Sequence, residues 1–371
     1  MARIGFEVTL VERERFPRHK LCGEFISPEC LKHFDELGVL PGLLAAGGEQ
    51  IHETRFYDRR GNSFGVPSRL LDEGGFALSL SRSEMDDRLL RCAQDAGVEV
   101  CEGTAVTGVE MSGGRISEVV LKNSLGERRS VKSDLFVDAT GRAGMLSKLA
   151  GRQSGSDRSR STAPVAVGFK THLEGARTAP GTCEIFFFPG GYGGLTPVEN
   201  GLTNLCFLVD ARLARKFGGA ADDIVRSALH TNLRAAHALE HAKPVFDWLA
   251  VSISSFGRTR PLDINNLFSV GDSAAFIDPF TGSGMLMALE SSSLLAKAAA
   301  AVPADDIAKV YQSAYEKHFS RRLRICSVLR RAAFLPAVPT LAIKFLSSSK
   351  PSRGLLARLT RPERPVRPEI S

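Results

Sequence analysis

Apolar and polar positions along the first part of the chain follow two different periods. Residues 6–12 (FEVTLVE) form a short apolar run that ends in an acidic residue, which predicts a buried strand. Residues 28–39 and 83–100 carry apolar side chains at helical spacing, and each stretch includes a glycine that ends the helix. Ser83 is the expected N-cap of the second helix. This alternation of strands and helices predicts an α/β domain.

The middle and later parts of the chain first depart from this pattern and then return to it. Residues 106–123 alternate on both sides of Ser-Gly-Gly, which predicts a hairpin, and residues 133–141 (SDLFVDATG) predict a buried strand closed by a glycine loop. Strand-like runs separated by Gly and Pro follow over 164–210, as in an antiparallel sheet, and residues 222–239 are helical. A strand, a loop and a long helix over 267–301 then restore the α/β pattern.

The nucleotide-binding part is therefore expected to be discontinuous in sequence. We predict an α/β fold in which a Rossmann-like domain carries an inserted antiparallel-sheet (α+β) substrate domain and a C-terminal helical tail. The expected boundaries are 1–50, 76–160 and 257–302 for the nucleotide-binding domain, 51–75 and 161–256 for the substrate domain, and 303–371 for the basic tail.

Composition narrows the class of protein. With 43% hydrophobic and 24% charged residues among 371, the chain is neither disordered nor collagen-like. No apolar run approaches the roughly 18 to 20 residues of a membrane-spanning helix. The seven cysteines show no CxxC or Cys/His spacing, so we predict reduced thiols and no metal site. No secretory signal is evident at the start, and we expect a cytoplasmic protein.

Positive charge is concentrated at the C-terminal end. Residues 317–371 hold 13 Lys and Arg against two acidic residues, although the whole chain carries only +7. Two interpretations stay open: a solvated basic helix with an extended Pro-rich end, or a peripheral contact with an anionic membrane surface. We expect no nucleic-acid binding, because residues 330–346 offer only two phenylalanines for base stacking.

Three stretches carry residues suited to a nucleotide cofactor. Glu12 ends the first strand, where an acidic side chain can accept the hydroxyls of a ribose. Residues 138–144 (DATGRAG) are small enough for close backbone approach to a ligand. Asp272 follows a buried strand, and residues 281–285 (TGSGM) open a helix whose free N–H groups can hold a pyrophosphate or a ring oxygen. The structural alternatives are a surface glutamate and simple turns.

Together these segments resemble a known family. VTLVERERFPRHKLCGE, LSRSEMDDRLL, DLFVDATG and FSVGDSAAFIDPFTGSGMLMALESSSLLA are similar, in order and spacing, to landmarks of FAD-dependent oxidoreductases of the geranylgeranyl reductase-like group, within the para-hydroxybenzoate hydroxylase-type class. The resemblance covers residues 1 to about 300 and implies FAD as cofactor. It implies the following cofactor-binding residues: Glu12 and Arg13 at the adenosine ribose, Arg82 at the phosphates or ribityl chain, Val106 at adenine, Asp272 at the ribityl or pyrophosphate region, and Gly282, Ser283, Gly284 and Met285 at the flavin.

The same resemblance raises a question about the start of the sequence. The family begins with a strand and a G-x-G-x-x-G loop about 20 residues before the position of Gly5. The sequence here starts at Met1 and contains no such loop. We therefore expect that the chain is truncated at an internal methionine.

Two further stretches bear on the reaction. PRHKLCGE (17–24) resembles the family segment that lies against the flavin ring, which makes Cys22 and Glu24 flavin-facing catalytic candidates; a structural loop with a buried thiol is the alternative. EIFFFPGG (184–191) resembles a sheet segment that forms an apolar substrate pocket, here with Phe186, Phe188 and Pro189. In flavin-dependent halogenases this segment contains tryptophans. Phenylalanines replace them in this chain, so a halogenase is disfavoured.

Three functions stay open, and we favour the first. It is an FAD-dependent oxidoreductase that acts on a small hydrophobic substrate, isoprenoid-, polyketide- or aromatic-like, by hydride transfer through the flavin. The second is an aromatic monooxygenase that uses NAD(P)H and O₂. The third is a truncated, non-catalytic remnant of the fold. NAD(P)H is an electron-donor candidate, although no separate nicotinamide domain is evident.

Overall fold

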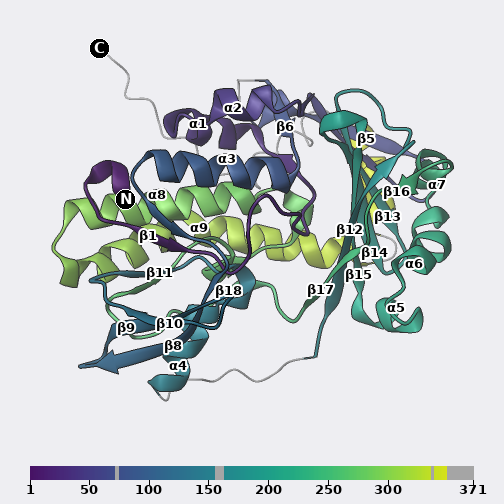
Figure 1. Cartoon of the computed structure of the whole chain (residues 1–371). Coiled ribbons are helices and arrows are strands. Elements are labelled where there is room, and N and C mark those ends of the chain that lie inside the picture. The colour runs from purple at the N-terminus through teal and green to yellow at the C-terminus, as the bar shows by residue number, and fades with distance from the viewer. Residues whose placement is uncertain (72–74, 155–162, 336–337, 349–371) are drawn as a thin grey trace, which may run out of the picture.

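Two groups of elements lie side by side in the molecule, one built around short parallel strands and one around a large sheet (Figure 1). The computed structural model of the chain describes residues 1–71, 75–154, 163–335 and 338–348. The chain passes from the first group to the second and back, so each group is assembled from separate stretches of sequence.

The nucleotide-binding part contains two separate pairs of parallel strands. Strand β1 (Thr9–Val11) pairs with β7 (Glu99–Cys101), and β11 (Phe136–Asp138) pairs with β19 (Leu267–Ser269). In the described ranges no strand pairs with the second edge of β1 or of β11. The predicted parallel strands are thus present, but they do not form one continuous sheet.

Helices and a small meander cover the two sides of these strands (Figure 1). On one side lie the long helices α3 (Arg82–Asp95), α8 (Gly284–Ala301) and α9 (Ile307–Ala333). On the other side lie β8 (Thr104–Ser112), β9 (Arg115–Asn123), β10 (Arg128–Val131) and α4 (Met145–Gln153). Aromatic side chains of α9 pack with α8 and β19 in one apolar cluster, so the first part of the predicted tail belongs to this core.

Short elements complete the nucleotide-binding part. Helices α1 (Pro28–Glu36) and α2 (Leu40–Ala45) pack near a three-stranded sheet of β2 (Phe25–Ile26), β6 (Ala77–Ser79) and β3 (Glu49–Ile51). The hydroxyl of Ser81 accepts a hydrogen bond from the N–H of Glu84 at 3.2 Å, which makes Ser81 the N-cap of α3. The prediction of Ser83 was wrong, because the N-cap lies two residues earlier, at Ser81, and Ser83 lies in the first turn of the helix.

The large sheet contains eight strands. Its order is β16-β12-β15-β14-β13-β4-β5, with β17 also paired to β12. The strands are β4 (Glu53–Tyr57), β5 (Ser63–Pro67), β12 (Ala166–Glu174), β13 (Thr182–Phe188), β14 (Gly191–Pro197), β15 (Thr203–Asp210), β16 (Lys243–Pro244) and β17 (Leu249–Ile253). The prediction of an antiparallel sheet holds except where β4 pairs with β13 in parallel.

Side chains of the large sheet alternate between two faces with different chemistry. The outer face carries Phe169, Phe186, Phe188 and Phe207 and is covered by the short helices α5 (Ala211–Lys216), α6 (Ala221–Ser227) and α7 (Leu233–Leu239). The inner face carries the residues between them, including Lys170, His172, Asn204, Phe187 and Tyr192. Helix α10 (Val338–Ser348) packs against β5 and the aromatic part of this inner face.

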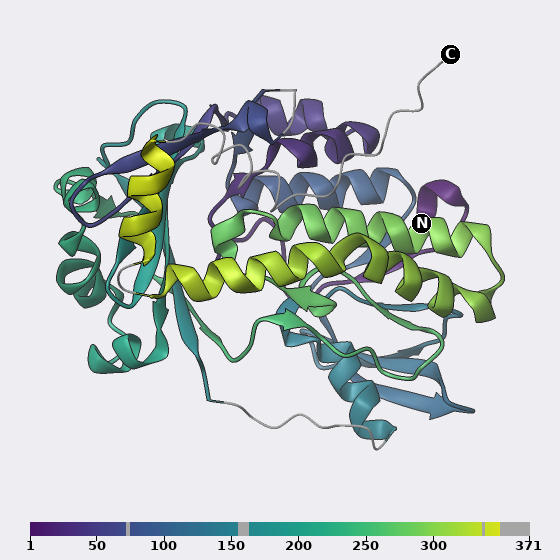
Figure 2. The same ribbon diagram turned by 180° about the vertical axis from the view of Figure 1, so that it is seen from behind.

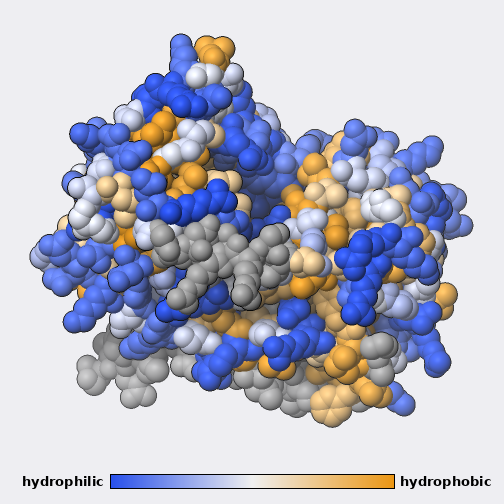
Figure 3. Space-filling view, turned by 90° about the horizontal axis from the view of Figure 1, so that it is seen from below, coloured by the Kyte–Doolittle hydropathy of each residue, from blue (hydrophilic) through white to orange (hydrophobic). Residues whose placement is uncertain are grey.

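A view from below shows how the two groups of elements are separated (Figure 3). The surface is hollowed between the lobe that contains α4 and β8–β10 and the lobe of the large sheet. The predicted site residues of both parts are therefore expected along the inner face of the sheet, where the two groups meet.

Candidate functional site

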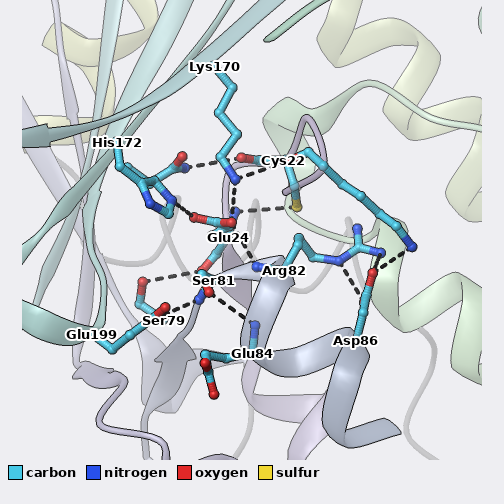
Figure 4. A network of polar contacts seen from close by, with 12 residues as sticks. Cys22, Glu24, Ser79, Ser81, Arg82, Glu84, Asp86, Lys170, His172 and Glu199 are labelled. Carbon is cyan, nitrogen blue, oxygen red and sulfur yellow. Dashed lines mark hydrogen bonds and ion pairs between the residues drawn. The ribbon is translucent and has the colours of Figure 1, made fainter. Parts of the chain in front are cut away.

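A buried group of charged side chains joins the two parts of the molecule (Figure 4). Glu24 comes from the loop before β2, whereas Lys170 and His172 stand two residues apart on the inner face of β12. Lys170 Nζ donates to one carboxylate oxygen of Glu24, and His172 Nε2 lies 2.6 Å from the other. The backbone N–H of Arg82 also donates to Glu24, at 2.8 Å. The side chains of Glu24 and Lys170 are 0% exposed.

The charges of this group stabilise one another. Burial by itself raises the pKa of Glu24, but the hydrogen bond from His172 and the positive charge of Lys170 outweigh burial and lower that pKa. A buried charge without a partner is strongly unfavourable, so each member depends on the others. Glu24 adopts a left-handed backbone conformation with φ 55°, which is uncommon for a residue other than glycine. The group therefore holds the loop that contains Cys22 in a defined position.

A second ionic group fixes the other side of the same loop. Lys20 Nζ lies 2.6 Å from a carboxylate oxygen of Asp86, and the Arg82 guanidinium donates two hydrogen bonds to that carboxylate, at 2.9 and 2.8 Å. Burial opposes ionisation of Asp86, but Arg82 and Lys20 lower its pKa. Figure 4 shows Arg82 and Asp86, both on helix α3, beside the Glu24 group. The segment 17–24 is thus anchored both to α3 and to the large sheet.

Cys22 lies between these two groups. Its sulfur accepts a hydrogen bond from the N–H of Glu24 at 3.4 Å, and its carbonyl accepts one from Asn204 Nδ2 at 3.1 Å. The thiol also interacts with the Arg82 guanidinium. Cys22 is only partly buried, as expected of a residue that meets a ligand, whereas Glu24 is fully enclosed. This arrangement favours a positioning role for Glu24, because no part of its carboxylate is exposed to a flavin.

Asp272 and the start of α8 form the part of the site suited to FAD. Asp272 follows β19, and burial raises its pKa to about 6, although Arg82 and Arg142 act in the opposite direction. In the described part of the chain its carboxylate receives no direct hydrogen bond, so the hydroxyls of a ribityl chain suit it. A side chain at Gly284 would meet nothing within 4 Å, which leaves space in front of the helix N-terminus. These residues fit the cofactor.

The other predicted cofactor-binding residues lie on several separate elements. Glu12 directly follows β1, and one of its carboxylate oxygens accepts a hydrogen bond from the N–H of Glu14 at 2.9 Å. Arg13 forms an ion pair with Glu14 and its side chain is 73% exposed, so it points to solvent. Val106 lies in β8, the edge strand of the meander. Gly282 has φ +60°, a conformation that favours glycine, and it ends the turn before Ser283 and Met285.

The predicted pocket residues Phe186 and Phe188 lie on the outer face of the sheet. They pack with the residues of α5–α7 and are 0% and 6% exposed, and Pro189 lies exposed in the turn that follows. Strand alternation instead turns Phe187 to the inner face, where its ring centroid is 5.6 Å from that of Phe280. Of the three phenylalanines of this segment, Phe187 is therefore the one on the inner face.

Sequence reasoning missed several residues of the inner face. Lys170 and His172 lie in VAVGFKTHL, where a Lys-x-His pair interrupts an apolar strand; this was the signal that two charged side chains share one face. Tyr192 donates a hydrogen bond to Asp278, next to the turn of Phe280. Burial raises the pKa of both Tyr192 and Asp278, which keeps the phenol neutral. No sequence signal linked these two residues, which are 86 positions apart.

The fold, together with Asp272 and the start of α8, defines the class of FAD-dependent oxidoreductases. The chain matches the family described as "FAD binding domain" over residues 1–325 and therefore belongs to it. It is 26% identical to a menaquinone reductase of Mycolicibacterium smegmatis over 352 residues, which cover 91% of this chain and 80% of that protein. A digeranylgeranylglycerophospholipid reductase of Methanosarcina acetivorans is 26% identical over 86% of this chain and 75% of the relative.

Halogenases are also among its relatives. A tryptophan 2-halogenase of Chondromyces crocatus is 28% identical over 86% of this chain, which spans only 62% of that protein. Among solved structures, a geranylgeranyl bacteriochlorophyll reductase-like protein of Thermoplasma acidophilum has a TM-score of 0.79 at 18% identity and covers 96% of this chain and 90% of its own. A flavin-dependent brominase has a TM-score of 0.79 at 20% identity, with 97% and 88% covered. The predicted family resemblance, fold class and cofactor are confirmed.

Proposed function

We propose that this protein is an FAD-dependent reductase that transfers a hydride to a carbon–carbon double bond of an apolar, lipid-like substrate. The inner face of the large sheet carries this proposal. One end of that face presents aromatic rings beside the start of α8, and the other end holds Cys22 through Asn204 and the Glu24 group. An apolar chain suits the first end, and proton transfer suits the second.

The aromatic end consists of rings that pack on one another around Phe280. Phe56, Phe187 and Tyr192 lie with their ring centroids 5.7, 5.6 and 5.5 Å from that of Phe280. The hydroxyl of Tyr192 is bound to Asp278, and the rings of Tyr192 and Phe187 are 5% and 7% exposed, so this end of the inner face is apolar and largely enclosed. Such a surface stabilises an aliphatic or aromatic substrate through burial of apolar area and offers little to a charged one.

We propose that Cys22 is the residue that donates the proton in this reaction. FAD, when bound, supplies the hydride. Reduction of a double bond also requires a proton at the second carbon, and the partly exposed thiol of Cys22 is positioned by hydrogen bonds on both its sulfur and its carbonyl. The guanidinium of Arg82 lies beside this thiol and interacts with it.

Anaerobic turnover tests the proposal. The FAD-loaded chain is reduced with dithionite, and a menaquinone or a geranylgeranyl lipid is added without oxygen. We expect oxidation of the flavin and a product with two additional hydrogens. Replacing Cys22 with Ala should slow that step about 10²- to 10⁴-fold, and Cys206→Ala on the inner face is the matched control. A flavin that stays reduced until oxygen is added would contradict the proposal.

A halogenase is the second candidate, because a halogenase is among the relatives. The same sample distinguishes the two functions. An oxygen pulse in the presence of bromide or chloride, with an aromatic acceptor such as tryptophan, should yield no halogenated product if the reductase proposal is correct. Coupled oxygen uptake without halogenation would instead support the aromatic monooxygenase.

A further inference from the structure

A stripe of exposed residues follows the second half of α9. Its members recur at intervals of three and four residues, which places them on one side of the helix. All are exposed, and Val328 and Leu335 remain 65% and 54% exposed although they are apolar. The stripe consists of Arg321, Arg324, Val328 and Arg331 on α9, and of Leu335 two residues beyond the end of that helix. It therefore combines cations with apolar side chains on one surface.

Helix α10 continues this surface. Its outward side carries Leu341 and Phe345, which are 65% and 64% exposed, with Lys344 between them. Its inward side carries Ile343 and Leu346, which are 1% and 9% exposed and pack on the inner face of the large sheet. Figure 2 shows α9 and α10 together on the face turned toward the viewer. The outward apolar side chains are thus additional to those that α10 needs for packing.

The charge of this region has a single sign. From residue 317 to residue 348 the sequence contains seven Lys and Arg and no Asp or Glu. Arg322 is used internally, since its side chain is buried against Glu290 at 2.8 Å, and the exposed arginines of the stripe lie outside that pair. A second copy of the chain would bring like charges together, which disfavours self-association through this surface.

An anionic bilayer can bind both the positive charge and the exposed apolar side chains of this surface. Basic side chains bind anionic headgroups, while exposed leucine and phenylalanine side chains enter the boundary between headgroups and acyl chains. In the described part of the chain no single helix is long and apolar enough to cross a membrane; the segments Ala304–Ala333 and Val338–Ser347 meet that requirement only together and are bent by 109°. The bend suits helices that lie along a surface.

We propose that α9 and α10 form a docking surface for a bilayer that contains anionic lipids. The position of α10 adds a functional consequence, which rests on the proposed function. Its inward residues share an apolar cluster with Phe187 and Tyr192, and Phe280 packs against that cluster. A helix seated in the headgroup region therefore lies one side-chain layer from the proposed substrate face, so an apolar substrate would have a short route from the membrane.

Co-sedimentation of the full chain with vesicles tests the docking surface. Vesicles of phosphatidylcholine alone are compared with vesicles that also contain phosphatidylglycerol, at low and high salt and without FAD or substrate. We expect binding only to the anionic vesicles, weakened by salt. Arg324→Glu with Arg331→Glu, and separately Leu341→Ser with Phe345→Ser, should each weaken binding by at least about tenfold.

Matched changes elsewhere on the surface serve as controls. Leu125 is 83% exposed and Arg128 is exposed, both near the β9–β10 turn, so Leu125→Ser and Arg128→Glu should leave vesicle binding unchanged. Equal circular dichroism spectra and thermal midpoints show that all variants are folded. Failure of the full chain to bind anionic vesicles at low salt, or self-association in place of vesicle binding, would overturn the proposal. Because no turnover is measured, failure of the proposed reductase activity leaves this result unaffected.

Discussion

The two faces of the large sheet are built by the same strands but have different compositions. The outer face is mainly phenylalanine and leucine covered by α5–α7, with a buried Glu184 that binds Arg234 of α7. The inner face places a Lys–Glu–His group, a cysteine-binding asparagine and an aromatic group along one surface. Strand alternation therefore places most of the apolar core of this part on one face and the Lys170 and Asn204 contacts on the other. Variants on the two faces, and at Asp272 outside the sheet, test this division.

The largest effect is expected from Lys170 on the inner face. Lys170→Met removes the ammonium that faces the buried Glu24 carboxylate and leaves it only the contacts of His172 and the Arg82 N–H, and this should lower the free energy of unfolding by about 3 to 5 kcal/mol. Adding Glu24→Gln removes that charge, so the double variant should regain part of the loss. Urea denaturation measures both, with Lys216→Met at an exposed position as control. Equal destabilisation by the two lysine variants would contradict the buried group.

The position of this group explains what sequence reasoning could and could not find. The nucleotide-binding elements were predictable because their signals are local: Asp272 after an apolar strand, or the glycines before α8. Glu24, Lys170 and His172 are brought together over about 150 positions by packing of the loop before β2 against β12, and no local pattern encodes that contact. The sequence of three consecutive phenylalanines likewise does not tell which of them lies on the inner face, because a one-residue shift in a strand exchanges the two faces.

A smaller effect, on FAD binding, is expected from substitution of Asp272, which follows β19 in the nucleotide-binding part. Asp272→Asn should weaken FAD binding by about 1.5 to 3 kcal/mol, because a hydrogen bond from a charged group to the cofactor is lost. Fluorescence titration with FAD measures this, with Asp263→Asn at an exposed position as control. Unchanged affinity would show that Asp272 does not contact the cofactor.

The same variant has a defined pH dependence in the chain without FAD. The folded-state pKa of Asp272 is raised from 3.8 to about 6, so between these values the folded state binds more protons than the unfolded state. Asp272 therefore contributes stability below its unfolded pKa, and that contribution is lost as pH rises through about 6. Asp272→Asn should flatten this part of the stability profile, by at most about 1.4 kcal/mol per pH unit. If the pH dependence of the free energy of unfolding were the same in the variant, Asp272 would be in contact with water and its pKa would not be raised.

The smallest effect compares two adjacent phenylalanines on opposite faces. Phe186 is 0% exposed in the outer core, so Phe186→Leu should lower the free energy of unfolding by about 1 to 1.5 kcal/mol and leave the KM for an apolar substrate unchanged. Phe187 contacts Phe280 on the inner face, so Phe187→Leu should cost less stability and raise that KM. Thermal unfolding and anaerobic turnover on both variants separate these outcomes. The opposite result would assign the substrate to the outer face, because only a substrate-facing ring changes KM without a matching loss of stability.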